Sequence, residues 1–303
     1  METRVLPFDD ESIGQAARLI LAGEPVAVPT ETVYGLAADA TNAKAVARIY
    51  EAKCRPSFNP LIVHVPDLAA AELIGRFEPQ ARVLAERYWP GPLTLVVPLR
   101  DDAEIAPVVT AGLSTIGLRV PAHPAMQALL REAARPLAAP SANASGSISP
   151  TRAEHVLKSL KGRISLIIDG GQTERGLEST IVAATGPQLR LLRPGPIEVE
   201  AEGGSSDKIE APGQLASHYA PSKPLRLNAR VAEQDEYLIG FGAVEGRSSL
   251  STSGDLVEAA ARLFDLLHEA DASDKHCIAV APVPNRGLGA VINDRLRRAA
   301  APR

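Results

Sequence analysis

The chain has 303 residues, enough for two domains or for one large domain with an appendage, and a core of this size needs neither disulfides nor a structural metal. Hydrophobic residues make up 45% and charged residues 22%, which are globular values that exclude a disordered, collagenous or coiled-coil chain. The net charge of −4 and the 4% of aromatic residues argue against general nucleic-acid binding through phosphate attraction or base stacking.

The elements predicted from the sequence begin with a helix that starts at Asp10 and is closed by Gly23. Its apolar residues recur at helical spacing: Ile13, Ala16, Ala17, Ile20 and Leu21. A strand is predicted at 25–29, and further short apolar runs alternate with helical stretches at 61–65, 93–99, 116–120, 164–169 and 179–184. This order predicts a mixed α/β sheet. The segment between the runs at 93–99 and 116–120 has no clear helical period, which favours antiparallel pairing of these two predicted strands.

A change in composition divides the chain near its last third. Residues 195–224 hold four glycines, four prolines and four serines without a period of 2 or 3.6, which predicts a linker. After it the pattern restarts with a strand at 236–242, a helix over 255–269, a strand at 277–283 and a helix beginning near Gly289. We therefore expect a small α/β domain over 225–303.

Cysteine and histidine spacing gives no sign of a metal site. Cys54 and Cys277 form no CxxC pair, and the six histidines form no HExxH motif. The cysteine usage indicates a reducing compartment. The N-terminal segment has no basic-then-apolar signal pattern, and no apolar run reaches the roughly 18 residues of a membrane span. We expect a cytoplasmic protein without a membrane segment.

Common nucleotide motifs are missing from the sequence: GxxxxGK[ST], GxGxxG after a strand, and the GxSxG nucleophile elbow. Instead, six strand-end loops carry groups that hold phosphate, namely arginines, hydroxyls and backbone N–H groups beside glycine. These loops are PTETVYG (29–35), KCRPSFNP (53–60), GLRVPAHP (117–124), APSANASGSISP (139–150), GLEST (176–180) and RPGP (193–196). Because ligands of α/β sheets gather beyond strand ends, we expect these loops to meet at one polyphosphate site.

The same loops carry a family resemblance. KCR at 53–55 matches a K-x-R element and SAN at 141–143 an S-x-N element, and PTETVYGLAADA and RPGP complete the pattern. Together they resemble the threonylcarbamoyl-adenylate synthases with the YrdC-like fold. SHYAPSKP (217–224) and AVINDRLRRAA (290–300) resemble the long form of that family. The resemblance implies a YrdC-like catalytic domain over 1–194, built as a twisted mixed sheet with flanking helices. It also implies a linker or lid over 195–224 and a Rossmann-like α/β domain over 225–303.

The implied reaction is a nucleotidyl transfer. It converts L-threonine, bicarbonate or CO2, and ATP with Mg²⁺ into threonylcarbamoyl-AMP and diphosphate, for the t6A modification of A37 in ANN-decoding tRNAs. A downstream tRNA threonylcarbamoyl transferase complex is the implied recipient. An N-carboxylated threonine attacks the α-phosphorus while diphosphate leaves in line, so the site must hold two anions together. No protein nucleophile is required, and we expect the ATP phosphates to hold most of the Mg²⁺ coordination.

The resemblance also assigns residues to each substrate. Around L-threonine it places Thr32, His64, Arg119, Ala139 and Ser179, where Ala139 offers only its backbone and Arg119 suits the carboxylate. Around ATP it places Arg55, Asn59, Thr115, Ser141, Asn143, Ser149, Arg193 and Tyr219. Lys53 and Arg55 are the implied catalytic residues. The glycines and serines of the linker further predict a lid that brings Tyr219 over the nucleotide.

Several of these residues also fit purely structural roles. His64 lies in an apolar run, like a core histidine, and Lys53 and Arg55 fit a solvated loop. Ser141 and Asn143 are common turn formers. Ser149 and Pro150 fit the N-cap and first residue of a helix over 151–160.

Glu31 and Asp169 are candidate Mg²⁺ ligands by residue type, although surface solvation is the simpler interpretation of both. Cys54 is assigned no catalytic role.

Two other functions stay open. A YrdC-like concavity lined with cations could bind RNA without catalysis, and direct tRNA binding is undecided, although the charge of −4 argues against it. Carbamoyl transfer occurs in hydrogenase-maturation proteins that embed a similar domain, but these carry zinc-finger cysteine clusters that this sequence lacks.

Overall fold

The computed structural model contains two sheets, and we describe residues 2–203, 210–213 and 217–302 of it. Within these ranges the larger sheet has eleven strands in the order β1-β8-β2-β3-β7-β4-β6-β5-β9-β10-β11. They are β1 (Arg4–Pro7), β2 (Val26–Pro29), β3 (Tyr34–Asp39), β4 (Ile62–His64), β5 (Leu93–Pro98), β6 (Thr115–Arg119), β7 (Leu137–Ala138), β8 (Leu166–Asp169), β9 (Thr180–Ala183), β10 (Arg190–Arg193) and β11 (Glu202–Gly203). β4 and β6 pair in parallel, whereas β5 and β6 pair antiparallel. The mixed sheet and the antiparallel pair are therefore confirmed.

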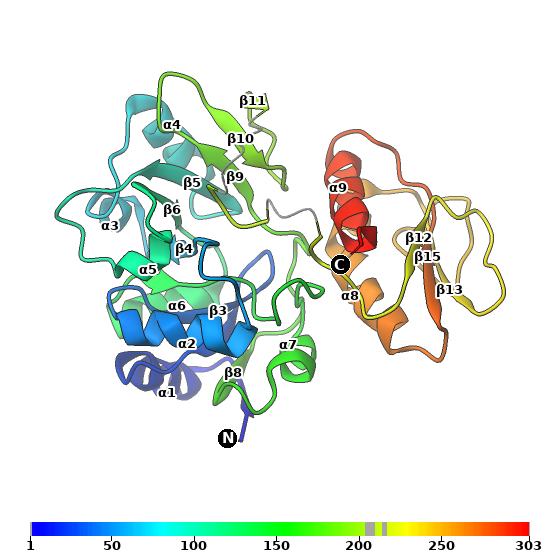
Figure 1. Cartoon of the computed structure of the whole chain (residues 1–303), viewed down its shortest axis with the longest axis horizontal. Coiled ribbons are helices and arrows are strands. Elements are labelled where there is room, and N and C mark those ends of the chain that lie inside the picture. Colours follow the sequence, from blue (N-terminus) through cyan, green and yellow to red (C-terminus); the bar gives the residue numbers. More distant parts are fainter. Residues whose placement is uncertain (1, 204–209, 214–216, 303) are drawn as a thin grey trace.

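Helices cover both faces of this sheet (Figure 1). They are α1 (Asp10–Leu21), α2 (Ala43–Lys53), α3 (Leu68–Glu72), α4 (Pro79–Tyr88), α5 (Pro107–Thr110), α6 (Pro124–Ala133) and α7 (Ala153–Leu160). Val26 and Val28 of β2 pack in one core with α1 and α6, whereas Ala27 packs in a second core with α2 and α7. Successive strand residues point to opposite faces, so a strand buried on both sides is apolar throughout, as the run at 25–29 is.

The C-terminal domain lies beside the larger sheet, on the right of Figure 1. It contains β12 (Leu225–Leu227), β13 (Glu236–Gly240), β14 (Ser248–Ser249), α8 (Leu256–Ala272), β15 (Cys277–Val280) and α9 (Leu288–Ala300). The strands pair in parallel in the order β12-β15-β13-β14, as in a Rossmann-like domain. Val33, Ile148 and Leu177 of the N-terminal part belong to the same hydrophobic cluster as the core of this domain. The two parts therefore share a packed apolar interface.

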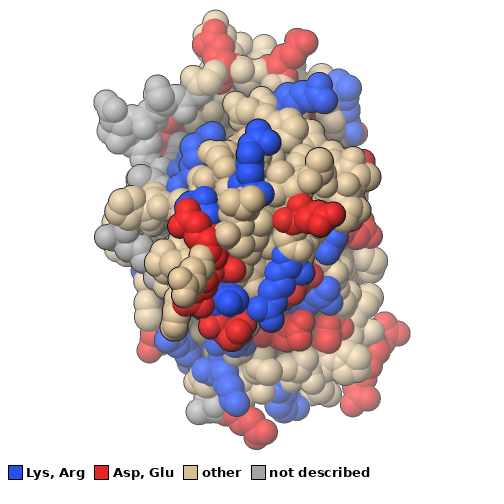
Figure 2. Space-filling model, turned by 90° about the vertical axis from the view of Figure 1, so that its right-hand side faces the viewer, with Lys and Arg blue, Asp and Glu red and all other residues tan. Residues whose placement is uncertain are grey.

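Polar contacts extend this interface beyond its apolar centre. Arg152 donates two hydrogen bonds to the carboxylate of Asp265 on α8, at 2.6 and 3.0 Å. The rings of His155 on α7 and His268 on α8 stack with their centroids 3.8 Å apart. On the face of the molecule toward which this domain lies, acidic and basic side chains are interspersed rather than gathered into one basic area (Figure 2).

The structure corrects one predicted boundary. The helix expected to begin at Ser149 and Pro150 begins at Ala153 instead, and its N-cap is Arg152. The carbonyl of Pro150 accepts a hydrogen bond from the Tyr34 amide, and that of Thr151 from the Thr173 amide. These long-range bonds hold 150–151 in an extended path, so the Ser149 side chain is free for another role.

The predicted linker 195–224 contains one short strand, β11, whose residues pair with β10. Residues 204–209 and 214–216 of that linker lie outside the described residues. Among the helices that are described, none combines the length and apolar character needed to cross a bilayer.

Candidate active site

A cavity lies where the loops of the larger sheet meet the linker. All six predicted loops contribute to its walls, and the linker adds Pro212, Gly213 and His218. Nine residues assigned from the sequence line it: Thr32, Arg55, His64, Arg119, Ala139, Ser141, Ser179, Arg193 and Tyr219. The segments that supply them are up to 187 positions apart in the chain, from Thr32 to Tyr219.

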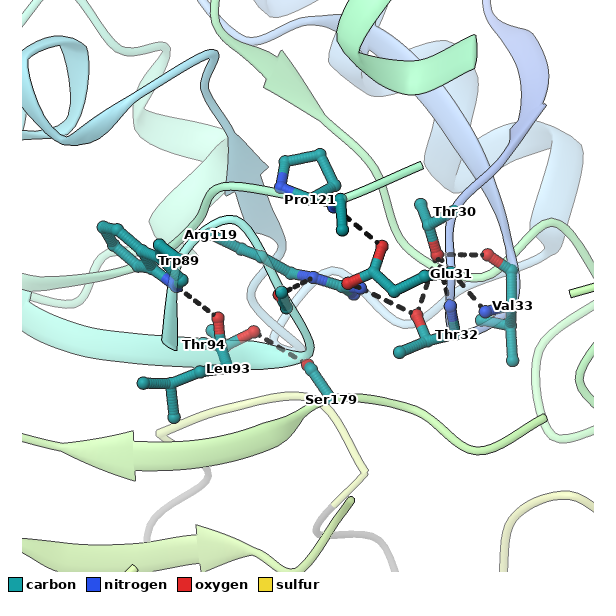
Figure 3. Close-up of polar contacts among 12 residues, drawn as sticks. Thr30, Glu31, Thr32, Val33, Trp89, Leu93, Thr94, Arg119, Pro121 and Ser179 are labelled. Atoms are coloured by element: carbon teal, nitrogen blue, oxygen red, sulfur yellow. Dashed lines mark hydrogen bonds and ion pairs between the residues drawn. The ribbon is translucent and has the colours of Figure 1, made fainter. Parts of the chain in front are cut away.

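Arg119, the last residue of β6, lines the cavity at what we call its Arg119 end, and its side chain points toward Glu31 and Thr32 (Figure 3). Its Nη2 donates to Glu31 Oε1 at 2.6 Å and to Thr32 Oγ1 at 3.0 Å, and its Nε donates to the carbonyl of Gly91. The second oxygen of Glu31 accepts from the amide of Ala122 at 3.0 Å. These bonds fix the guanidinium in one orientation, with a buried carboxylate behind it.

Glu31 is therefore not the solvated surface residue that its type favours. Its side chain is 6% exposed and that of Arg119 is 5% exposed. Burial by itself would raise the pKa of Glu31, but the charge and hydrogen bond of Arg119 outweigh it and hold the pKa below its ordinary value. Because its oxygens are occupied by Arg119 and Ala122, Glu31 acts on the cavity through Arg119.

His64 lies directly beside Arg119, since the two residues are register partners in β4 and β6. Burial, reinforced by the charge of Arg119, lowers the pKa of His64 to about 3, so its ring is neutral at physiological pH. Its Nδ1 finds no hydrogen-bond partner in the described part of the chain. A neutral ring with an unpaired nitrogen in the cavity wall is more typical of a ligand contact than of a satisfied core histidine.

Ser179 forms the floor between the two ends of the cavity. Its Oγ lies 2.8 Å from Thr94 Oγ1 on β5, as Figure 3 shows, and it accepts from Arg193 Nη2 at 3.0 Å. Arg193, the last residue of β10, also donates from Nε and Nη2 to the carbonyl of Ser179. Ser179 thus holds Arg193 in place at a second, cationic end of the cavity.

Arg55 and Arg193 make that second end strongly cationic. Arg55 donates to the carbonyls of Asn59 and Pro60, and burial lowers its pKa to about 10. Within the described ranges, neither arginine has a carboxylate within ion-pair distance, since their partners are carbonyls and the Ser179 hydroxyl. Buried cations without a directly paired carboxylate favour an anionic ligand.

Lys53 does not line this cavity although it is two residues from Arg55. Its Nζ donates to the carbonyls of Ser141 and Asn143, both at 2.5 Å. Burial, followed by the charge of Arg55, lowers its pKa well below the ordinary value. Lys53 therefore holds the 141–143 loop in place, and Ser141 of that loop lines the cavity.

Four other residues assigned to ATP lie outside the cavity wall. Asn143 donates to the carbonyls of Ala144 and Ser147, and Asn59 is buried with an Oδ1 that lacks a partner among the described residues. Thr115 lines a small adjoining pocket that shares Ile62 and Pro212 with the cavity. Ser149 donates to Glu178, a cavity-lining carboxylate that the sequence analysis missed.

Described residues of the linker line one side of the cavity and leave little free space in it. Only about 50 Å³ of it is open to a water molecule, whereas pockets for nucleotide-sized ligands span roughly 300 Å³ or more. Gly213 has a φ of +87°, and a Cβ there would lie 2.8 Å from Arg193 Cδ and 3.0 Å from the Tyr219 hydroxyl oxygen. A glycine thus lets the linker lie directly on the cationic end.

Comparisons with known proteins agree with this fold. The Sua5_yciO_yrdC family model, with the description Telomere recombination, matches residues 18–195. A second model, Sua5_C, with the description Threonylcarbamoyl-AMP synthase, C-terminal domain, matches residues 175–301. The chain belongs to the Sua5/YciO/YrdC family. The two matches overlap over 175–195, the segment that contains Ser179 and Arg193.

Relatives of the Sua5/YciO/YrdC family match over nearly the whole chain. The threonylcarbamoyl-AMP synthase of Bacillus subtilis is 42% identical, covering 99% of this chain and 96% of the relative. That of Pyrococcus abyssi is 40% identical, covering 97% and 95%. The crystal structure of P. abyssi Sua5 complexed with L-threonine superposes with a TM-score of 0.89 at 36% identity, covering 98% of each chain. Escherichia coli YciO shares the fold alone, with a TM-score of 0.59 at 23% identity over 65% of this chain and 98% of that one.

Proposed function

We propose that the chain is an L-threonylcarbamoyladenylate synthase, which makes threonylcarbamoyl-AMP and diphosphate from L-threonine, bicarbonate or CO2, and ATP. The proposal rests on one buried cavity that has an oriented arginine, Arg119, at one end. At the other end lie Arg55 and Arg193, two arginines without carboxylate partners among the described residues. Relatives named threonylcarbamoyl-AMP synthase, 42% and 40% identical over nearly the whole chain, support it. A related structure that holds L-threonine supports the amino-acid end.

The Arg119 end suits a small amino acid. Glu31 and Thr32 occupy one side of the guanidinium, so the remaining N–H groups can bind the carboxylate of L-threonine in a charge-assisted pair. The neutral ring of His64 adds no charge beside the amine, and Ser179 offers a hydroxyl within the same wall. We assign this end to L-threonine.

The reaction joins two anions, so the second end must offset their repulsion. The threonine nitrogen bonds to the carbon of CO2 and loses a proton, which gives a carbamate. A carbamate oxygen then bonds to the α-phosphorus. The bond between the α-phosphorus and the oxygen that bridges to the β-phosphorus breaks, and diphosphate leaves with that oxygen. Arg55 and Arg193 are held in place before ATP binds, and fixed cations of this kind stabilise the charge that develops on the phosphates.

Mg²⁺ accompanies ATP in this proposal rather than binding to a site built from the chain. No group of three or more His, Cys, Asp or Glu residues is arranged to hold a metal ion within 2–203, 210–213 and 217–302. Glu178, which lines the cavity, and Glu31, which lies behind Arg119, are both engaged by other residues. The residues present do not fit a protein-held ion, so no step is assigned to one.

The linker acts as a lid in this proposal. The closed cavity is too small for ATP, so Gly213 and Tyr219 must move to admit it and then return. Closure excludes water from the phosphates and from the mixed anhydride of the product, which water would hydrolyse.

We further propose that the product serves t6A formation at A37 of ANN-decoding tRNAs, through a separate tRNA threonylcarbamoyl transferase complex. A cytoplasmic location fits this role, and both cysteines are free, as in a reducing compartment.

Diphosphate release from ATP tests the activity. We expect release only when L-threonine, bicarbonate and magnesium are all present, and labelled bicarbonate should appear in an adenylate separated by chromatography. Release that continues without L-threonine would contradict the proposal. Tight and steeply salt-dependent tRNA binding without ATP turnover would favour the RNA-binding alternative instead.

A further inference from the structure

Arg295 of the C-terminal domain reaches the cavity wall from α9. It is the largest fully buried side chain among the described residues, with 1% of its surface exposed. Its Nε donates to Glu178 Oε2 at 3.0 Å and its Nη2 to the carbonyl of Pro194 at 2.8 Å. The guanidinium carbon lies 5.3 Å from the ring centre of Tyr219. One side chain thus contacts three separate segments around the cavity.

Each of these segments carries part of the cationic end. Glu178 precedes Ser179 and accepts the hydrogen bond of Ser149, and Pro194 follows Arg193. Tyr219 lines the cavity, and its hydroxyl finds no partner in the described part of the chain. A shift of Arg295 would therefore move groups on several sides of the nucleotide end together.

Charge gives Arg295 a second effect on this end. Glu178 is buried in the cavity wall, where a free carboxylate would repel a triphosphate. Burial alone would raise the pKa of Glu178, but Arg295 and then Arg193 outweigh it, and the group stays ionised. Arg295 thus neutralises a carboxylate that would otherwise oppose ATP.

The C-terminal domain supports the Glu178 loop from another side as well. Gly176 has a φ of +64°, and a Cβ there would lie within 2.5 Å of the carbonyl oxygens of Ala260 and Ala261 on α8. The backbone of the loop is therefore in contact with α8 while its carboxylate is held by α9.

We propose that Arg295 is a positioning residue for the ATP end of the site, which makes the C-terminal domain a working part of the active site. It orients Glu178, and through it Ser149, and it fixes Tyr219. This inference rests on the proposed function, because it presumes that the Arg55 end holds ATP.

The test compares Arg295→Met with two matched variants in the full-length protein. Arg297→Met removes an exposed arginine of the same helix, and Arg152→Met breaks the ion pair with Asp265 between the two domains outside the cavity wall. Initial rates of diphosphate release give separate KM values for ATP and L-threonine. We expect Arg295→Met to raise the KM for ATP at least about tenfold and that for L-threonine less than about threefold, with both matched variants within about threefold of the unchanged protein.

Two outcomes would overturn the proposal: an unchanged KM for ATP, or equal effects on both substrates that Arg152→Met reproduces. The second would mean that Arg295 only holds the domains together. An unchanged protein that lacks threonine-dependent diphosphate release would instead contradict the proposed function, so the two failures are distinguishable.

Glu178→Gln/Arg295→Met keeps the test decisive if the single variant does not fold. It removes both charges of the buried pair and leaves an acceptor for Ser149. Where the single variant folds, we expect the double variant to recover part of the lost ATP affinity, and no recovery would contradict the charge argument. Where it does not fold, a double variant whose KM for ATP is raised at least about threefold supports positioning, and an unchanged KM overturns it.

Discussion

Arg119→Met tests the amino-acid end of the site through two separate quantities. The substitution removes the cation assigned to the threonine carboxylate and leaves Glu31 buried without its partner. Breaking a buried ion pair from one side costs about 3–5 kcal/mol of folding stability. Loss of a charge-assisted hydrogen bond to the substrate costs about 1.5–3 kcal/mol, which corresponds to a roughly 10- to 100-fold rise in the KM for L-threonine.

The stability loss has a definite pH dependence. In the unchanged protein the pKa of Glu31 is held below its unfolded value of 4.5, so Glu31 stabilises the fold above that pH, and the stabilisation is lost as the pH falls through the lowered pKa. In Arg119→Met burial is opposed only by the backbone amides of Glu31 and Ala122, and we expect the pKa of Glu31 to rise above 4.5. Protonation then relieves the buried charge as the pH falls, so the difference from the unchanged protein is largest near neutral pH and narrows toward about pH 5.

Guanidinium chloride unfolding at about pH 7.5 and about pH 5 measures this difference, provided that the slope with denaturant is the same for both proteins. Glu31→Gln/Arg119→Met is the control, since it carries no charge at either position. We expect this double variant to be more stable than Arg119→Met near neutral pH. Its difference in unfolding free energy from the unchanged protein should not become smaller at the lower pH. Two results would refute the argument. One is a difference in unfolding free energy between Arg119→Met and the unchanged protein that is equal at both pH values, and the other is a double variant no more stable than Arg119→Met.

Three further changes test other parts of the site and its support. Arg55→Ala should lower kcat/KM for ATP at least about tenfold in initial-rate assays, and a value near that of the unchanged protein would mean that ATP binds elsewhere. Tyr219→Ala should raise hydrolysis of the product or lower turnover. Unchanged kinetics, together with a protease sensitivity of the linker that does not change when ATP binds, would contradict the lid hypothesis. Gly176→Ala should cost about 1–3 kcal/mol, because its Cβ would overlap backbone oxygens of α8, whereas Gly186→Ala meets no atom within 4 Å and should unfold at the temperature of the unchanged protein.

Long apolar or periodic segments made much of the fold predictable from the sequence. The helix predicted from Asp10 is α1, and the runs at 61–65 and 93–99 contain β4 and β5. Strands such as β7, with two residues, are too short to show a period. β3 falls partly inside the 29–35 loop, and its pairing with β7 joins residues about a hundred positions apart. The short strands that position the site depend on tertiary pairing, which local pattern does not encode.

The cavity walls were predictable as a set of loops, but the direction of each side chain was not. Lys53 and Arg55 belong to the same K-x-R element, yet only Arg55 lines the cavity. α2 ends at Lys53, and Cys54 adopts the left-handed conformation with a φ of +50°, which turns the chain between the two cations. A non-glycine residue in that conformation leaves no reliable local signal, so the sequence assigned one role to two residues that do different work.

Arg295 shows the same limit over a longer range. It lies in a helix with two other arginines, and its burial against Glu178 separates it from the exposed Arg297. The sequence pattern of α9 predicts an amphipathic helix of the C-terminal domain and gives no sign that one of its arginines faces a cavity in the other domain. Composition and spacing describe each domain separately, so a group shared between domains is found only from the assembled structure.

In the proposed mechanism, burial of the arginines also favours closure of the lid over the nucleotide. Arg55 and Arg193 are held by carbonyls, with no carboxylate of the described residues at ion-pair distance, and burying such cations costs folding energy that a bound anion would offset. When the linker closes over an empty cavity, the cost of burying the two arginines remains. When it closes over a triphosphate, the arginines form charge pairs with the phosphates, and these pairs are strong because water is excluded. The same arrangement that makes the empty closed cavity unfavourable therefore favours closure with ATP in place. This couples lid closure to the nucleotide rather than to the amino acid, whose carboxylate meets an arginine that already has a partner in Glu31.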